Sequence, residues 1–167
     1  LEPASGDETI DAAGLYILPG FIDPHVHMEL GFMGTVSADD FEAGTASGAA
    51  GGTTYIIDFC IPAPGESMLA ALASWRAKAA KAVCDYSFHM AITSWSDKSA
   101  EEMRQVVQEH GITSFKVFMA YKGAIMVDDA ALYSVMREAA KLGAVVTVHA
   151  ENGDAVWHLQ RELLAKG

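Results

Sequence analysis

The sequence has little of what marks a membrane protein or a disulfide-rich secreted protein. No uninterrupted apolar run approaches the roughly 18 residues of a membrane span. The acidic first residues, LEPASGDETID, lack the basic and apolar regions of a signal peptide. Cys60 and Cys84 lie far apart without a CxxC pattern, so we expect two reduced thiols and neither a disulfide framework nor a zinc knuckle. These absences predict a soluble, cytoplasmic protein.

Basic side chains are also scarce. Lysine and arginine together number 11, against 22 aspartate and glutamate residues, which gives a formal net charge of −11. An acidic protein repels the backbone of nucleic acids and the surface of an anionic membrane, so we expect neither as a partner. With 167 residues, of which 51% are hydrophobic, the chain is long and apolar enough to form a globular domain with a sizeable core.

Strand and helix patterns alternate along the chain. Runs rich in β-branched and aromatic residues recur roughly every thirty residues, and between them apolar residues repeat with helical spacing. This alternation is typical of βαβ units and a parallel sheet. The expected strands cover residues 20–27, 53–59, 85–93, 113–120 and 144–150. The expected helices lie around residues 68–75, 103–107, 132–139 and 153–166.

Capping residues mark the ends of these helices. Ser99 and Asp128 stand where a side-chain oxygen could accept the first free N–H groups of a helix, so we expect both to be N-caps. Gly111 and Gly143 follow helical patterns, and glycine readily adopts the left-handed conformation that ends a helix. We therefore expect both glycines to be C-caps.

Two α/β folds share this alternation, the doubly wound sheet and the (β/α)8 barrel, and the faces of the strands distinguish them. In the fourth expected strand, Phe115 and Val117 share one face while Lys116 and Phe118 share the other. The first and fifth expected strands also set an apolar face against one that carries ionisable groups near the carboxyl end. Barrel enzymes place their chemistry at that end. The pattern therefore favours a partial TIM-type (β/α)8 barrel of about five βα units.

The histidines suggest a metal site. His25 and His27 form an HxH motif on one strand, which places both imidazoles on the same face and close enough to chelate one ion. A pair of hydrogen-bonded barrel histidines is the alternative interpretation. His149 lies at the corresponding end of another strand and on the same face, which favours the metal site. Of the remaining histidines, we expect His89 to be a hydrogen-bonded core residue. We expect His110 and His158 to lie on the surface.

Lys116 is unusual because it stands among apolar residues and faces the histidines. An ammonium group with a pKa near ~10.4 is a poor ligand and would repel a metal ion. If the amine reacts with carbon dioxide, the resulting carbamate is an anionic oxygen donor that can bridge two metals. The alternative is an ion pair with Asp23 or Glu151 inside the barrel. Lys122 follows the end of the strand, so we expect it to point to solvent.

Five segments together resemble one known family. They are LPGFIDPHVH, GTVSADDFEAGT, AAGGTTYIIDFC, SFKVFMAYK and VHAENGD. With these segments the chain resembles the hydantoinase and dihydropyrimidinase branch of the amidohydrolase superfamily over essentially its whole length. The combination of segments is specific, whereas HxH by itself would not be.

The resemblance implies two divalent ions, usually zinc. By this resemblance His25 and His27 hold one ion and His149 binds the other. Lys116, as its carbamate, bridges both. Tyr121 is implied to donate a hydrogen bond to the oxyanion that forms on the substrate carbonyl. The apolar residues implied to line the pocket for the ring substituent, with simple packing as their alternative role, are Leu30, Phe32 and Phe118.

The resemblance also implies that the 167 residues are a piece of a longer enzyme. Residues 1–18 would be the end of a flanking β-sandwich region and a linker, and residues 19–167 the N-terminal part of the catalytic barrel. The family's further metal-binding histidine and its acid/base aspartate lie on later strands, so we expect the isolated chain to be a poor hydrolase. In the intact protein we expect a homo-oligomer, a tetramer or a dimer.

The implied reaction is hydrolytic opening of a cyclic amide, a hydantoin or a 5,6-dihydropyrimidine, to an N-carbamoyl amino acid. Dihydroorotases resemble this scaffold but carry an arginine two residues after HxH. The residue here is Glu29, which we expect to repel an anionic ring substrate. Allantoinase is one alternative. A non-enzymatic dihydropyrimidinase-like scaffold protein is another, and the retained histidines, lysine and tyrosine argue against it.

Overall fold

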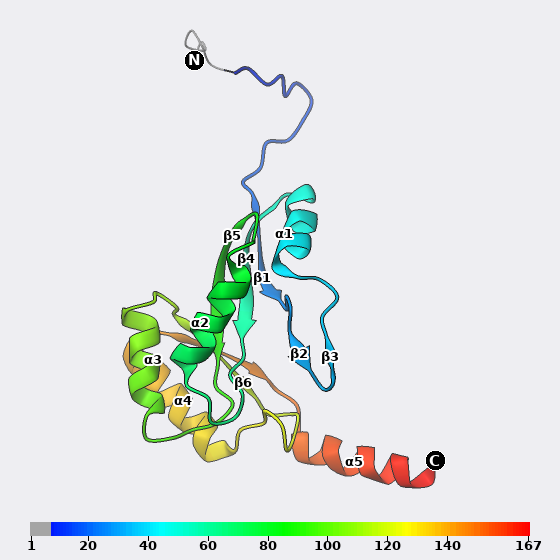
Figure 1. Ribbon diagram of the computed structural model, residues 1–167, viewed down its shortest axis with the longest axis vertical. Helices are drawn as coiled ribbons and strands as arrows, with labels where there is room; N and C mark the ends of the chain where they lie inside the picture. The colour runs from blue at the N-terminus through cyan, green and yellow to red at the C-terminus, as the bar shows by residue number, and fades with distance from the viewer. Residues whose placement is uncertain (1–7) are drawn as a thin grey trace.

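A single parallel sheet of five strands organises the chain. The computed structural model describes residues 8–167, and its sheet has the order β1-β4-β5-β6-β7 with every neighbouring pair parallel (Figure 1). All five expected strands are present, with ends within two residues of those expected. Their bounds are Phe21–Val26 for β1, Thr53–Cys60 for β4, Asp85–Ala91 for β5, Ser114–Phe118 for β6 and Val145–His149 for β7.

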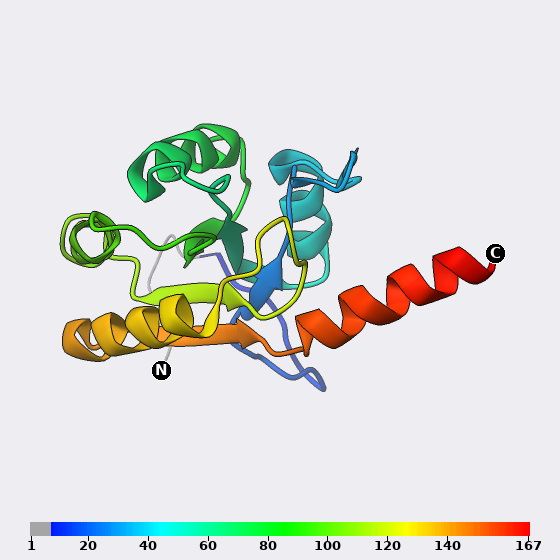
Figure 2. The same cartoon turned by 90° about the horizontal axis from the view of Figure 1, so that it is seen from below.

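Four helices cover one face of this sheet, and the sheet curls away from them (Figure 1, Figure 2). The strands follow one another in chain order without the reversal of a doubly wound sheet. The arrangement is therefore a partial (β/α)8 barrel, as the strand faces predicted. The helices are α1 (Phe41–Ala50), α2 (Met68–Ala79), α3 (Ser99–Gln108) and α4 (Asp129–Leu142).

The last helix, α5 (Gly153–Lys166), extends away from the sheet in both views (Figure 1, Figure 2). Only Gly153 of this helix is buried. None of the helices in residues 8–167 combines the length and apolarity needed to span a bilayer. Residues 8–20 precede β1 without a helix or strand. The expectation of a β-sandwich end over residues 1–18 stays a prediction, because residues 1–7 lie outside the described part.

The cap residues confirm two expectations and correct two. Asp128 caps α4 by accepting the N–H of Ala131 at 2.8 Å, and Gly143 ends that helix in the left-handed conformation with φ 65°. The expected N-cap at Ser99 is wrong, because Ser99 is already the first residue of α3. Its hydroxyl accepts the N–H of Ser96 at 2.9 Å, so it stabilises the preceding turn. Gly111 is left-handed, with φ 70°, but lies beyond the C-cap of α3.

The faces of β6 divide the buried residues into two clusters. Phe115 and Val117 are fully buried in the larger cluster, which lies between the sheet and the helices. Phe118 belongs to a smaller cluster with Ala91 and Ile125 on the inner face of the sheet. The expected alternation along this strand is therefore confirmed, and the side chains next to the histidines lie on the inner face.

Two elements were not expected from the sequence. Helix α1 begins at the N-cap Asp40, whose carboxylate accepts the N–H of Ala43 at 2.8 Å. A short antiparallel hairpin, β2 (Gly31–Phe32) and β3 (Thr35–Val36), follows β1. Its two turn residues both have positive φ, as a type I′ turn requires. This hairpin carries Phe32 over the carboxyl end of the sheet.

Candidate metal centre

A pocket of about 420 Å³ lies on the inner face at the carboxyl ends of the strands. All eight site residues expected from the sequence line it, although they come from β1, the segment between β1 and the hairpin, the hairpin itself, β6, the loop after β6, and β7. Two further residues, Ile61 and Ile125, were not expected. The lining consists of His25, His27, Leu30, Phe32, Ile61, Lys116, Phe118, Tyr121, Ile125 and His149.

The two histidines of the HxH motif lie side by side on one aromatic ring. The centroids of the His25 and His27 rings are 5.2 Å apart, and both rings pack on Phe59 of β4, at 4.5 and 4.9 Å. Burial lowers the pKa of His27, and the neighbouring His25 and Lys116 lower it further. The imidazole of His27 is therefore neutral near pH 7, which is the form that binds metals.

Lys116 is buried between two aromatic rings. Its side chain lies on the inner face with 7% of the residue exposed. Its Nζ lies 5.4 Å from the centroid of Phe59 and 5.3 Å from that of Phe118. Among residues 8–167 no carboxylate forms an ion pair with it, so the alternative of a pair with Asp23 or Glu151 is wrong. Burial lowers the pKa of this amine.

His149 occupies the other side of Lys116. Its ring lies 6.2 Å from Phe118, one of the two rings that flank the lysine, and 5.2 Å from Tyr121. Its Nε2 donates to the carboxylate of Glu151, which leaves Nδ1 as the nitrogen with a free lone pair. Lys116 therefore lies between the His25 and His27 pair and His149.

These residues fit a metal centre only if the lysine is a ligand. Within residues 8–167 no three His, Cys, Asp or Glu side chains are gathered so that they could hold a metal ion. The donor set consists instead of two imidazoles on one side of Lys116 and one on the other. A carbamate on Lys116 would supply the missing anionic oxygens and reach toward both sides, so the set fits two ions with a bridging lysine.

Tyr121 lies at the mouth of the pocket in a strained backbone conformation. Its φ is 66°, a left-handed value that is rare for a bulky residue. Its ring meets that of Phe32 edge-on at 5.2 Å and lies 6.0 Å from that of Phe118. The backbone carbonyl of Tyr121 accepts the N–H of Ala124 at 2.9 Å, which closes the turn after β6. Strain of this kind is concentrated at functional sites.

The apolar wall of the pocket comes from the hairpin and from the ends of the strands. Phe32 and Ile61 pack on the small inner cluster, which contains Phe118 and Ile125. Leu30 is held by its backbone, because its N–H donates to the hydroxyl of Ser37 at 2.8 Å. These apolar side chains share the pocket lining with the histidines and the lysine.

Glu29 does not face the pocket, which corrects one expectation. Its φ is 48°, a left-handed value, and its side chain reaches Lys81, which follows the end of α2. Its carboxylate accepts from the ammonium of Lys81 at 3.0 Å. Because Glu29 is not a lining residue, it cannot repel an anionic ring there as expected.

The other singled-out residues lie as expected. His89 is a satisfied core histidine, because its Nε2 donates to the carbonyl of Pro24 at 2.9 Å and its Nδ1 accepts from the hydroxyl of Ser114. His110 accepts from Arg76 at 3.1 Å on the surface, and His158 is exposed. The exposed Lys122 pairs with Asp154 on the surface. The only two cysteines are free thiols, Cys60 and Cys84.

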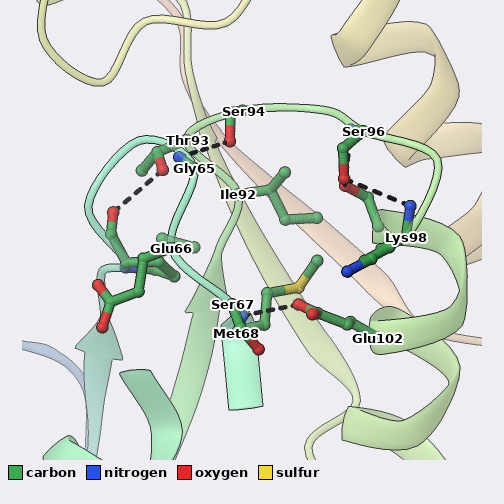
Figure 3. Close-up of a pocket in the computed structure, with 13 residues that line it drawn as sticks. Gly65, Glu66, Ser67, Met68, Ile92, Thr93, Ser94, Ser96, Lys98 and Glu102 are labelled. Carbon is green, nitrogen blue, oxygen red and sulfur yellow. Dashed lines mark hydrogen bonds between the residues drawn. The ribbon is translucent and has the colours of Figure 1, made fainter. Parts of the chain in front are cut away.

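A second pocket, of about 190 Å³, lies between the loops after β4 and β5 (Figure 3). Several of its polar groups hydrogen-bond to one another. Glu102 accepts the N–H of Met68 at 2.7 Å, Thr93 donates to the carbonyl of Pro62 at 3.0 Å, and Ser94 accepts the N–H of Gly65 at 3.1 Å. The cluster therefore closes the two loops and caps α2.

Known proteins resemble the chain over nearly its full length. It is 52% identical to a D-hydantoinase of Geobacillus stearothermophilus over 164 residues, which are 98% of this chain and 35% of that protein. It is 48% identical to a dihydropyrimidinase of Rattus norvegicus, with 99% of this chain and 32% of that protein covered. The chain thus spans about a third of the length of the curated relatives it matches.

Solved structures agree with these sequences. The crystal structure of a dihydropyrimidinase from Brevibacillus agri matches with a TM-score of 0.95 at 50% identity, over 98% of this chain and 36% of that one. A D-hydantoinase crystal structure matches with a TM-score of 0.96 at 50% identity, over 99% and 36%. The model of the amidohydrolase family matches residues 16–162, which include every residue that lines the pocket. With this match the chain belongs to the amidohydrolase family.

Proposed function

We propose that the protein containing this chain hydrolyses a cyclic amide, opening a hydantoin or a 5,6-dihydropyrimidine ring to an N-carbamoyl amino acid. The observation that carries the proposal is Lys116, buried without a carboxylate partner in residues 8–167, between the HxH pair and His149 in one pocket. The names of the relatives, D-hydantoinase and dihydropyrimidinase, support this class of substrate.

The proposed centre holds two divalent ions, for which zinc is the first choice. His25 and His27 would hold one ion, His149 the other, and the carbamate of Lys116 would bridge them. Such ions supply Lewis-acid polarisation of the amide carbonyl and a hydrolytic nucleophile at neutral pH. The lowered pKa of Lys116 supports the modification, because only the neutral amine reacts with carbon dioxide.

The remaining side chains would orient the substrate. The phenol of Tyr121 would donate its O–H to the oxygen of the amide carbonyl as negative charge develops there. The strained backbone at this residue supports such a positioned donor. Leu30, Phe32 and Phe118 would hold the substituent of the ring and exclude water from that side of the carbonyl.

The pocket also favours a ring without a carboxylate. Among the described lining residues Lys116 is the only lysine or arginine, and as a carbamate it would be an anion. A dihydroorotate carboxylate would therefore find no cation in this part of the pocket. Glu29, whose carboxylate pairs with Lys81, takes no part in this discrimination.

Two parts of the proposal concern the whole protein. We expect a homo-oligomer, a dimer or a tetramer, in the cytoplasm. Light scattering on the purified protein at its natural length would test the oligomer, and a monomer at micromolar concentration would contradict it.

The activity is tested on that protein with hydantoin, 5,6-dihydrouracil, dihydroorotate and allantoin, together with zinc analysis. We expect ring opening of the first two and bound zinc. Faster turnover of dihydroorotate or allantoin would contradict the proposed substrate class. A protein with neither zinc nor turnover would instead support the scaffold interpretation.

A further inference from the structure

We infer that Asp58 is a positioning residue that holds the HxH segment in place for metal binding. This inference rests on the proposed metal centre. Asp58 lies on β4 with 1% of the residue exposed, and its Oδ2 accepts the backbone N–H of Met28 at 2.9 Å. Met28 directly follows His27.

The end of β1 needs such an acceptor because its pairing with β4 is irregular. The register shifts between Asp23 and Val26, and Pro24 has no N–H to donate. Val26 is the last paired residue of β1, and its partner in the ladder is Asp58. The carboxylate of Asp58 therefore takes the place of a backbone acceptor one step beyond the regular ladder.

Alternation along β4 links Asp58 to the pocket. Asp58 lies on the helix-facing side, while its neighbour Phe59 faces inward and supports the rings of His25 and His27. Two adjacent residues thus hold the HxH segment. Phe59 packs on the histidine rings, and Asp58 hydrogen-bonds to the backbone. The other oxygen of Asp58 accepts the N–H of Phe59, which fixes the carboxylate itself.

Further contacts hold the segment from the helix side. The side chain of Met28 packs against Gly44 of α1, where an added Cβ would lie 2.4 Å from the Met28 sulfur and would force that side chain to shift. Lys78 of α2 donates to the carbonyl of Glu29 at 3.2 Å. Within this set, Asp58 is the fully buried side chain that hydrogen-bonds to the backbone of the residue directly after His27.

A buried carboxylate is costly, and here no ion pair offsets the cost. None of the ion pairs in residues 8–167 includes Asp58, and burial raises its pKa to about 7. An apolar residue would pack between the sheet and the helices with less penalty. A buried carboxylate at a position where an apolar residue would be more stable is expected where function requires the carboxylate.

The test compares three proteins at their natural length: the wild type, Asp58→Leu and Asp58→Asn. Leucine removes both acceptors but suits the apolar surroundings, whereas asparagine keeps one oxygen for the N–H of Met28. The probe is Zn²⁺, with its dissociation constant measured by competition with a chelator. The matched control is Ile56→Ala, on the same strand and the same buried face.

We expect Asp58→Leu to weaken Zn²⁺ binding by about 10- to 100-fold, the range seen when a group that orients a metal ligand is lost. Asp58→Asn should bind within about fivefold of the wild type. The control should lower the melting temperature yet keep its Zn²⁺ affinity within about threefold. If Asp58→Leu fails to fold, Asp58→Ala, which lets water reach the freed N–H, takes its place.

Two results would overturn this inference by itself. One is an Asp58→Leu or Asp58→Ala variant that binds Zn²⁺ as tightly as the wild type, which would leave the proposed function intact. The other is a loss of affinity in Ile56→Ala as large as in Asp58→Leu, since affinity would then follow stability alone. A wild type that binds no Zn²⁺ would overturn the proposed metal centre, and this inference with it.

Discussion

The two faces of the sheet differ in how their side chains are satisfied. On the helix-facing side, Phe115 and Val117 are fully buried among apolar residues of the strands and helices. On the inner side, Lys116 of the same strand is nearly as buried, yet its Nζ lies near two aromatic rings and pairs with no carboxylate of residues 8–167. One face stabilises the fold, and the other carries polar groups that the fold alone does not need.

The inner face itself contains both kinds of polar group. His89 has a partner for each ring nitrogen and stabilises the strands around it. His25 and His27 rest on Phe59, and Lys116 lies near that same ring. The side chains of His25, His27 and Lys116, which form no hydrogen bond within residues 8–167, line the pocket at the carboxyl ends of the strands, so position along the strand separates structural from chemical residues.

The largest effect is expected when Lys116, the lysine on the inner face, is removed. In the protein at its natural length, Lys116→Ala should lose bound metal and lower ring-opening activity by more than roughly 10⁴-fold, because the bridging donor is gone. Lys122→Ala is the matched control, since Lys122 is exposed and pairs only with Asp154 at the surface. It should keep its metal and its activity within about twofold. Metal analysis and a hydrolysis assay measure both, and a metal-loaded, active Lys116→Ala would contradict the assignment.

Substitutions on the helix-facing side should lower the stability of the protein without changing its catalytic activity. Phe115→Ala leaves a cavity among fully buried residues, so the free energy of unfolding should fall by about 3–5 kcal/mol. Denaturant unfolding measures this loss, and activity per folded molecule at low temperature should stay unchanged. Phe118→Ala, on the inner side, should instead raise KM. Reversal of these two outcomes would show that the faces are not separate in function.

A substitution of Tyr121 tests the proposed hydrogen-bond donor at the mouth of the pocket. Tyr121→Phe keeps the ring that packs on Phe32 but removes the proposed donor, so kcat should fall about 10²- to 10³-fold. Bound metal and stability should match the wild type. Steady-state kinetics with metal analysis checks this outcome. An unchanged kcat would remove Tyr121 from the mechanism, and a loss of metal would give it a different role.

The smallest expected effect is the pH dependence of stability that Asp58, on the helix-facing side, contributes. Burial raises the pKa of Asp58 to about 7, above the ordinary value of 3.8 that applies to the unfolded chain. Between these values the folded state binds the extra proton, so the carboxyl's contribution to stability falls as pH rises from about 4 to 7 and is constant above. The lowered pKa values of His27 and His89 act in the opposite direction in every variant and cancel in a difference.

Asp58→Asn removes this titration. In metal-free protein, the unfolding free energy of the wild type minus that of Asp58→Asn should therefore decrease between pH 5 and 7 and level off by about pH 8. Denaturant titrations at four pH values measure the difference. A difference that is independent of pH, or that rises with pH, would contradict the raised pKa.

Much of the fold follows from local sequence patterns. The alternation in β6 places Phe115 and Lys116 on opposite faces without any knowledge of the other strands. Helix α1 could not be predicted from helical spacing because Phe41 is the only large apolar residue in its sequence, FEAGTASGAA, which therefore shows no apolar repeat. It is stabilised by tertiary contacts of Phe41 and by the cap at Asp40, and the cap residue was the one available signal.

The site was predictable in its residues but not in its geometry. The motif and the strand faces point to His25, His27, Lys116 and His149, and the pocket brings them together. The direction of Glu29 depends on a left-handed backbone, which no pattern in the sequence indicates. Ile61 and Ile125 also escaped prediction, because they lie in loops after β4 and β6 where spacing does not determine a face.

The central claim is that Lys116 carries a carbamate that depends on metal. Its most direct test is a carbon-13 NMR spectrum of the protein at its natural length, recorded with labelled bicarbonate and zinc. We expect a protein-bound carbamate signal that disappears in Lys116→Ala, persists in Lys122→Ala and weakens when a chelator removes the zinc. A carbamate signal that survives in Lys116→Ala, or a zinc-loaded active wild type without any such signal, would contradict the account.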